Sequence, residues 1–335
     1  MTFLFHRAIA VGDNVVAIKA MLMLKKMYPK SKLIVYTNNI GENLYRNLPF
    51  IDSIIKDLSQ DLGQIDYFFV THRTKENIAI AKQTNARKII TKAYLHTLFC
   101  HRFINSFLLN TKHQPESKNL LHLVRLVDKS RFDDIFSSID FNEAKLQTTS
   151  ENEIFVDRFL QSHKIPKTPT TRIATRIANG GGQNSTHRKL ISTKRLIGIN
   201  IFGSGGVRYL SFQSWREIAT HLAKHFSDDY IILLCPPNQT IDDFPLKNVV
   251  IFKNNSDLLN LVALTKRLDW LISVDTGNVH IADNLQIPTL GLYTSKMFKR
   301  WRGGTYGGVF KGLIIKDSES ATKESCLTMV KNALS

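Results

Sequence analysis

Hydrophobic positions in the first 70 residues follow two alternating spacings. Short apolar runs at Phe3–Val11, Lys32–Tyr36 and Tyr67–Val70 are typical of buried strands, and Ser53–Ile55 predicts a further short strand. Between the first two runs, residues 15–27 carry apolar side chains at helical spacing, and a Tyr-Pro pair closes this predicted helix. Strands and helices that alternate in this way predict an α/β fold, with a parallel sheet covered by helices.

The same alternation restarts in the second half of the chain. Strands are predicted at residues 196–201, 230–234, 248–252, 270–274 and 289–292, and helices at residues 214–225, 257–265, 278–284 and 320–334. Two β/α halves of this kind predict two Rossmann-like domains with a cleft between them. Ligands of such sheets bind beyond the carboxyl ends of the strands.

The segment between the two halves has a different composition. Residues 164–195 contain two prolines, three consecutive glycines and many basic residues, but no acidic residue. This composition is typical of a flexible linker. We therefore predict an N-terminal domain at 1–165, a flexible basic linker at 166–195 and a C-terminal domain at 196–335. The pattern leaves open whether the last helix packs back on the N-terminal domain.

Composition restricts the class of protein. The chain of 335 residues is 43% hydrophobic and 22% charged, which suits a globular protein of two domains. Its three cysteines lie far apart, so neither a disulfide framework nor a zinc site is indicated, and a reducing cytoplasm fits best. No apolar run approaches the roughly 20 residues that cross a bilayer. We expect a soluble or peripheral protein.

The formal net charge of +17 predicts a polyanionic partner: nucleic acid, an anionic membrane face or phosphorylated small molecules. Basic and aromatic residues interleave at helical spacing between residues 71 and 125. One interpretation is a solvated charged helix over an ordinary core. The other is a face that contacts anionic lipid or glycolipid head groups, for which the candidates are Arg87, Lys88, Lys92 and Arg102.

The segment SVDTGNVHIAD, residues 273–283, is a candidate anion site. Asp275, Thr276 and Gly277 form the turn between a predicted strand and a helix, whose unpaired first-turn amides attract anions. Gly277 lets a ligand approach the backbone, and Thr276 and His280 can donate hydrogen bonds to a phosphate. The alternative is that Asp275 and Thr276 only cap the helix and that His280 is a core residue.

Two further segments carry candidate chemistry. The glycine-rich stretch FGSGGVR, residues 202–208, could cradle a phosphate, with Arg208 as the cation for a diphosphate or simply as a surface charge. It is neither a Walker A motif nor a GxGxxG fingerprint. Gly12-Asp13 lies between the first strand and the first helix. Asp13 is either a general base that faces the cleft or an N-cap.

In this order, the three segments resemble those of the ADP-heptose:lipopolysaccharide heptosyltransferases, glycosyltransferase family nine, with the GT-B fold of two facing Rossmann-like domains and an inter-domain cleft. The similar stretches are AVGDNVVAIKAMLMLKKMYPKSKLIVYTN, INIFGSGGVRYLSFQSWREIATHL and, most specifically, SDLLNLVALTKRLDWLISVDTGNVHIADNLQIPTLGLY. The chain departs from the family pattern at Asp283, where a small residue is usual.

The resemblance implies an inverting transfer of heptose from ADP-heptose to the lipopolysaccharide inner core, without metal or cofactor. Asp13 would deprotonate the acceptor hydroxyl. The implied donor site consists of Ser204, Gly205, Arg208, Asp275, Thr276, Gly277 and His280. The enzyme would be cytoplasmic and peripheral to the inner membrane, with an anionic glycolipid acceptor and no nucleic acid as partner. Two alternatives are a transferase of another nucleotide sugar to a surface glycan and an inactive GT-B-like binding module.

Overall fold

Two parallel sheets of six strands form the framework of the protein, which is represented by a computed structural model that describes residues 1–107, 113–166 and 194–334. The first sheet has the order β3-β2-β1-β4-β5-β6 and the second has the order β11-β10-β7-β12-β13-β14. The strands of the first sheet are β1 (Thr2–His6), β2 (Lys32–Tyr36), β3 (Ser53–Ile55), β4 (Tyr67–Val70), β5 (Lys88–Lys92) and β6 (Phe103–Ser106). Those of the second are β7 (Leu196–Asn200), β10 (Tyr230–Cys235), β11 (Val249–Lys253), β12 (Trp270–Val274), β13 (Thr289–Tyr293) and β14 (Phe310–Ile314). The predicted α/β class is confirmed.

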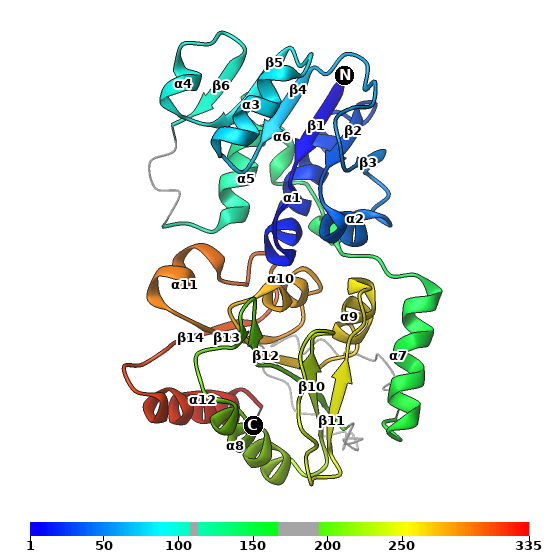
Figure 1. The fold of residues 1–335 in the computed structure, drawn as a ribbon, viewed down its shortest axis with the longest axis vertical. Coiled ribbons are helices and arrows are strands. Elements are labelled where there is room, and N and C mark those ends of the chain that lie inside the picture. The colour runs from blue at the N-terminus through cyan, green and yellow to red at the C-terminus, as the bar shows by residue number, and fades with distance from the viewer. Residues whose placement is uncertain (108–112, 167–193, 335) are drawn as a thin grey trace, which may run out of the picture.

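Both sheets follow one topology. Counted along each half of the chain, the strand order is 3-2-1-4-5-6 in both sheets. The direction of winding therefore reverses between β1 and β4 in the first sheet and between β7 and β12 in the second. A crevice opens at such a switch point beyond the carboxyl ends of the strands. These carboxyl ends face each other across the middle of the molecule (Figure 1).

The helices α1 (Val11–Met27) and α10 (Gly277–Asn284) join the two halves. Two glycines permit their close approach. A Cβ atom on Gly277 would lie 2.6 Å from the Cβ atom of Val11, and one on Gly12 would lie 2.6 Å from the Cδ2 atom of His280. The prediction that the first strand extends to Val11 was wrong, because β1 ends at His6 and α1 starts at Val11. Gly12 and Asp13 therefore lie in the first turn of the helix.

The last helix packs on the C-terminal domain. The side chains of Cys326, Val330 and Leu334 from α12 (Glu319–Leu334) join the apolar core that contains Trp215 of α8 (Phe212–His225). This settles the question that the hydrophobic pattern left open.

The helix that precedes the predicted linker, α7 (Ser150–Ser162), also lies against the C-terminal half (Figure 1). Asn152 Nδ2 donates to Asn260 Oδ1 of α9 (Leu258–Thr265) at 2.8 Å, and the rings of Phe159 and Phe252 meet edge to face. The predicted N-terminal domain thus contributes a helix that packs on the other half of the molecule. Residues 167–193, nearly all of the predicted linker, lie outside the described residues.

The basic segment between residues 71 and 125 is not one helix. It contains α3 (Lys75–Gln83), β5, α4 (Leu95–Leu98), β6 and α5 (Glu116–Arg125). The apolar residues Ile89 and Ile90 of β5 are buried between β4 and β6, so the charges at the two ends of this strand lie at opposite edges of the sheet. The prediction of one helical basic surface was wrong.

The remaining elements are α2 (Asn39–Tyr45), α6 (Lys129–Phe136), the 3-10 helix η1 (Phe141–Ala144), the two-stranded hairpin β8 (Phe202–Gly203) and β9 (Gly206–Val207), and α11 (Ser295–Trp301). None of the described helices combines the length and the apolar character that a bilayer crossing requires.

Candidate active site at the facing sheet edges

A cavity of about 450 Å³ lies between the facing carboxyl edges. It brings together candidates that stand more than 180 residues apart in the sequence. Its wall includes Asp13 from the N-terminal half and Ser204, Arg208, Asp275, Thr276, Gly277 and His280 from the C-terminal half. Of the residues proposed for the donor, Gly205 alone does not line this cavity.

The glycine-rich stretch forms a hairpin. Ser204 and Gly205 connect β8 and β9, and Gly206 adopts a φ of +116°, which favours glycine. The chain then returns to the cavity at Arg208, whose Nη1 donates to the carbonyl of Asp275 at 3.0 Å. The guanidinium of Arg208 also lies 4.7 Å from the ring centre of Tyr209. Arg208 is therefore held at the turn that precedes α10.

The start of α10 is not closed by a side chain. Thr276 occupies the N-cap position but makes no capping hydrogen bond, because its Oγ1 accepts instead from Asn200 Nδ2 at 3.0 Å. Thr276 is thus the N-cap residue by position, but its side chain does not cap the helix. The unpaired first-turn amides and the helix dipole make this end of α10 suitable for an anion. Gly277 has a packing role as well, since its missing side chain makes room for Val11 of the other domain.

Two buried polar atoms at this edge have no hydrogen-bond partner among the described residues: Asp275 Oδ2 and His280 Nδ1. Burial raises the pKa of Asp275 to about 6, although Arg208 opposes this shift. Burial lowers the pKa of His280 to about 4, so the imidazole is neutral at pH 7. His280 packs edge to face on Trp301, with ring centres 5.9 Å apart. It can offer a phosphate a hydrogen bond but no positive charge.

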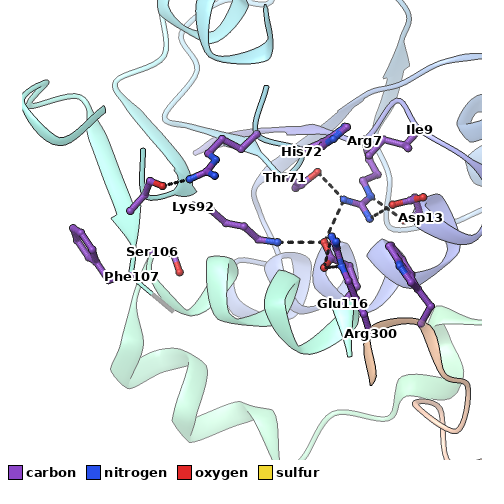
Figure 2. A pocket seen from close by; sticks show the side chains of 13 residues that line it. Arg7, Ile9, Asp13, Thr71, His72, Lys92, Ser106, Phe107, Glu116 and Arg300 are labelled. Carbon is purple, nitrogen blue, oxygen red and sulfur yellow. Dashed lines mark hydrogen bonds and ion pairs between the residues drawn. The ribbon is translucent and has the colours of Figure 1, made fainter. Parts of the chain in front are cut away.

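Asp13 projects from the first turn of α1. Its Oδ1 accepts from Arg7 Nη2 at 3.0 Å, and Arg7 Nε donates to the backbone carbonyl of Asp13 at 2.8 Å (Figure 2). Ala10 is the N-cap residue of α1, so the alternative in which Asp13 caps the helix is wrong. Burial raises the pKa of Asp13 above its usual value, against the opposing charge of Arg7. Its side chain is 21% exposed and can still meet a ligand.

A second cavity, of about 630 Å³, adjoins the first one, and Asp13 and Trp301 line both. Besides Asp13, its wall carries the charged side chains of Arg7, Lys92, Glu116 and Arg300 (Figure 2), and that of Arg73. Asp13 therefore stands between two spaces. One contains the open start of α10 and the other carries an excess of cations.

Only Lys92 of the four predicted basic surface residues reaches this second cavity. Arg87 forms an exposed ion pair with Asp66, and Lys88 Nζ donates to the carbonyl of His101. Arg102 Nη2 donates to the carbonyl of Ala86 at 2.8 Å, which ties two segments of the N-terminal domain together. The structure does not bring the four side chains together in one surface.

Sequence reasoning missed Arg7, Glu116, Arg300 and Trp301. Arg7 could have been found, because it directly follows an apolar strand and the carboxyl ends of parallel strands line ligand sites. Glu116 begins α5, and Arg300 and Trp301 end α11. Their proximity depends on how the two domains pack, and no local pattern reports this.

Comparisons with known proteins agree with this arrangement. Residues 213–328 match the sequence model of "Glycosyltransferase family 9 (heptosyltransferase)". A Haemophilus influenzae protein named "Putative glycosyltransferase" is 22% identical over 323 residues, which cover 87% of this chain and 83% of that protein.

Two solved structures show the same fold. The family 9 glycosyl transferase from Veillonella parvula superposes with a TM-score of 0.71 at 13% identity. The match covers 98% of this chain and 97% of the Veillonella chain. E. coli ADP-heptose lps heptosyltransferase II has a TM-score of 0.66 at 12% identity and covers 100% of this chain and 98% of its own. The predicted GT-B fold, the resemblance to family nine and the enzyme class of glycosyltransferase are confirmed.

Proposed function

We propose that this glycosyltransferase is an inverting, metal-independent enzyme that moves a heptose from ADP-heptose to the lipopolysaccharide inner core. The observation that carries the proposal is the position of Asp13 between two cavities, one of them lined in part by the segment that matches family 9. The structural similarity to an ADP-heptose lps heptosyltransferase supports this choice of donor and acceptor.

The first cavity is suited to the donor. Arg208 and the open start of α10 can neutralise a diphosphate and stabilise the charge that develops on it as it leaves. A fixed guanidinium and a helix terminus supply the electrostatic role that a bound metal ion has in other transferases. The described residues include no group of three or more His, Cys, Asp or Glu side chains suited to a metal ion.

The second cavity is suited to an anionic acceptor. Four cationic side chains line it and only two carboxylates oppose them, those of Asp13 and Glu116. A sugar that carries carboxylate or phosphate groups would be attracted there. Such an acceptor is part of a glycolipid, so we place the enzyme in the cytoplasm, peripheral to the inner membrane.

The proposed chemistry takes place at Asp13. Its carboxylate accepts the proton of the acceptor hydroxyl while that oxygen forms a bond to the anomeric carbon of the donor. The bond between the anomeric carbon and the diphosphate oxygen breaks, and the diphosphate leaves with the electron pair towards Arg208 and α10. Because the acceptor and the leaving group occupy opposite sides of the anomeric carbon, the configuration inverts.

A transfer assay with purified protein tests the proposal. Wild-type protein should release ADP from ADP-heptose in the presence of a truncated lipopolysaccharide acceptor. Asp13→Asn should bind the donor normally and lose transfer by about a hundredfold or more. Full activity of this variant would rule out Asp13 as the base.

Thermal unfolding with ADP, UDP or GDP would identify the donor base, since a ligand of the native state raises the melting temperature. Stabilisation by UDP or GDP alone would favour a transferase of another nucleotide sugar. Stabilisation by ADP without transfer to any acceptor would favour an inactive binding module.

A further inference from the structure

Glu116 is a buried carboxylate that the proposed reaction does not use. Its side chain is 2% exposed, although α5 begins with this residue at the wall of the second cavity. Three cations surround it. Arg7 Nη1 lies 3.9 Å and Lys92 Nζ 3.5 Å from Oε1, and Arg300 Nη2 lies 3.0 Å from Oε2. A charge removed from water in this way is tolerated because it is paired on every side.

The carboxylate of Glu116 has partners in both domains. Oε1 faces Arg7 and Lys92, which follow or end strands of the N-terminal sheet. Oε2 accepts from Asn119 Nδ2 of the same helix at 3.0 Å and from Arg300 Nε at 3.0 Å, and Arg300 belongs to α11 of the C-terminal half. Arg7 in turn binds the carboxylate of Asp13. A continuous series of ionic contacts therefore runs from the proposed base to the opposite domain (Figure 2).

We propose that Glu116 is a positioning residue that couples Asp13 to the closed arrangement of the two domains. Its carboxylate fixes Arg7 beside Asp13 and docks Arg300 when the sheet edges face each other. This inference rests on the proposed function, because it assumes that Asp13 is the base. The coupling would explain how Asp13 is aligned when the two domains together form both cavities.

The charges around Asp13 determine the direction in which each neighbour shifts its pKa. The charged and titratable groups that act on Asp13 from the neighbouring elements are Arg7, Glu116, Arg300 and His72. Glu116 raises the pKa of Asp13, whereas Arg7 and Arg300 lower it. Burial works to raise the pKa of Glu116 itself, but Lys92, Arg7 and Arg300 together hold it below its usual value. These three cations therefore favour the ionised form of Glu116.

Two substitutions should consequently act in opposite directions. Glu116→Gln removes a negative charge and leaves Arg7 to Asp13 alone, so the pKa of Asp13 falls. Arg300→Gln removes a positive charge and frees Glu116, so the pKa of Asp13 rises.

The pH dependence of kcat/KM tests the coupling, because its acid limb follows the pKa of the base in the free enzyme. We expect the limb to move to lower pH in Glu116→Gln, with kcat reduced about tenfold by the loss of alignment. We expect it to move to higher pH in Arg300→Gln. The effects of the double variant should not add, since both changes break one ion pair.

Arg46→Gln is the matched control. Arg46 Nη2 forms an ion pair with Asp257 Oδ2 at 2.8 Å, and this pair also links the two halves of the chain but lines neither cavity. The control should leave the acid limb in place. An equal shift in Arg46→Gln, or shifts of the same sign in the two test variants, would overturn the proposal.

A second measurement separates this proposal from the proposed function. The carboxyl carbon of Asp13 can be titrated by 13C NMR without substrate, with its signal assigned by its absence in Asp13→Asn. Opposite shifts of the titration midpoint in a protein that transfers no sugar would refute the function and keep the coupling. Unshifted midpoints in an active enzyme would refute the coupling and leave the proposed function standing. Should Glu116→Gln not fold, Arg300→Gln, whose side chain is 38% exposed, carries the test against Arg46→Gln.

Discussion

The two sheet edges that form the candidate site differ in how their polar groups are paired. At the N-terminal edge, Asp13 and Glu116 each contact the guanidinium of Arg7, and Glu116 has two further cations. At the C-terminal edge, Asp275 Oδ2 and His280 Nδ1 are buried without a partner among the described residues. A buried polar atom that lacks a partner costs free energy, so the second edge is less stable than it could be.

This difference indicates that the two edges have different roles towards a ligand. A network of paired charges fixes a reacting group and stays nearly the same when a ligand arrives. Unpaired groups beside an open helix terminus gain their partners from the ligand itself. Under the proposed function, the N-terminal edge would hold the base and the C-terminal edge would be completed by the donor. The predictions below test this division, from the largest expected effect to the smallest.

Replacement of Arg208, which is held at the turn before α10, should weaken donor binding most. Arg208→Gln removes a charge-assisted contact to the diphosphate, for which we expect a rise of roughly tenfold to a hundredfold in the KM for the donor. Calorimetric titration with ADP would measure the same loss without acceptor. Arg216→Gln is the control, because Arg216 lies on α8 away from both cavities. Unchanged donor affinity in Arg208→Gln would show that the diphosphate does not bind at this edge.

Gly277→Ala tests the close approach of α10 to the other domain. The new Cβ would lie 2.6 Å from the Cβ of Val11 and 3.1 Å from the backbone nitrogen of Gly12, neither of which can move without its helix. We expect a loss of about 1–3 kcal/mol in the free energy of unfolding, seen as a lower melting temperature. Gly205→Ala is the matched control, since a Cβ there meets nothing within 4 Å. Equal melting temperatures for the two variants would show that the helices do not meet as described.

Asp275→Asn should stabilise the protein without ligand at neutral pH. The folded-state pKa of Asp275 is about 6 against an ordinary value of 3.8, so the folded state holds this proton more tightly than the unfolded state. Its contribution to stability is complete below pH 3.8 and is lost as the pH rises through about 6. Asparagine has no such loss. The variant should therefore gain about 1–2 kcal/mol over wild type at pH 7 and almost nothing at pH 4.

Urea unfolding at both pH values measures this difference. If the donor gives the unpaired Oδ2 its hydrogen-bond partner, the same variant should also bind the donor less tightly. A stability difference that does not change with pH would mean that Asp275 is not an unpaired carboxylate in the folded protein.

Local patterns predicted the parts of this site that lie at strand ends. Asp275 and Thr276 directly follow the apolar strand β12, and parallel strands bring their carboxyl ends to one edge whatever else the chain does. The same reasoning misplaced residues where a local preference was ambiguous. The segment from Arg7 to Ala10 continues the apolar run of β1, yet β1 pairs only as far as His6.

Contacts between distant segments could not be predicted. Asp283, which departs from the family pattern, accepts hydrogen bonds from Thr305 N and Oγ1 and from Tyr306 N, and so holds a loop 22 residues away. Glu116 and Arg300 meet only because two domains pack together. The basic residues near β5 have helical spacing by count, but burial on both sides of the sheet determined their conformation.

The smallest expected effect distinguishes a cation in the site from one on the surface. Lys92 Nζ lies in the second cavity beside Glu116 and its side chain is 20% exposed, whereas Arg87 is 68% exposed at the opposite end of the sheet. Lys92→Gln should raise the KM for an anionic acceptor roughly threefold to tenfold and leave the KM for the donor unchanged. The effect should shrink at high salt because the ions screen a partly exposed charge. Arg87→Gln should change neither constant, since its ion pair with Asp66 is held in water. Equal effects of the two substitutions would favour the basic surface that the sequence suggested. They would also show that the acceptor does not bind in the second cavity.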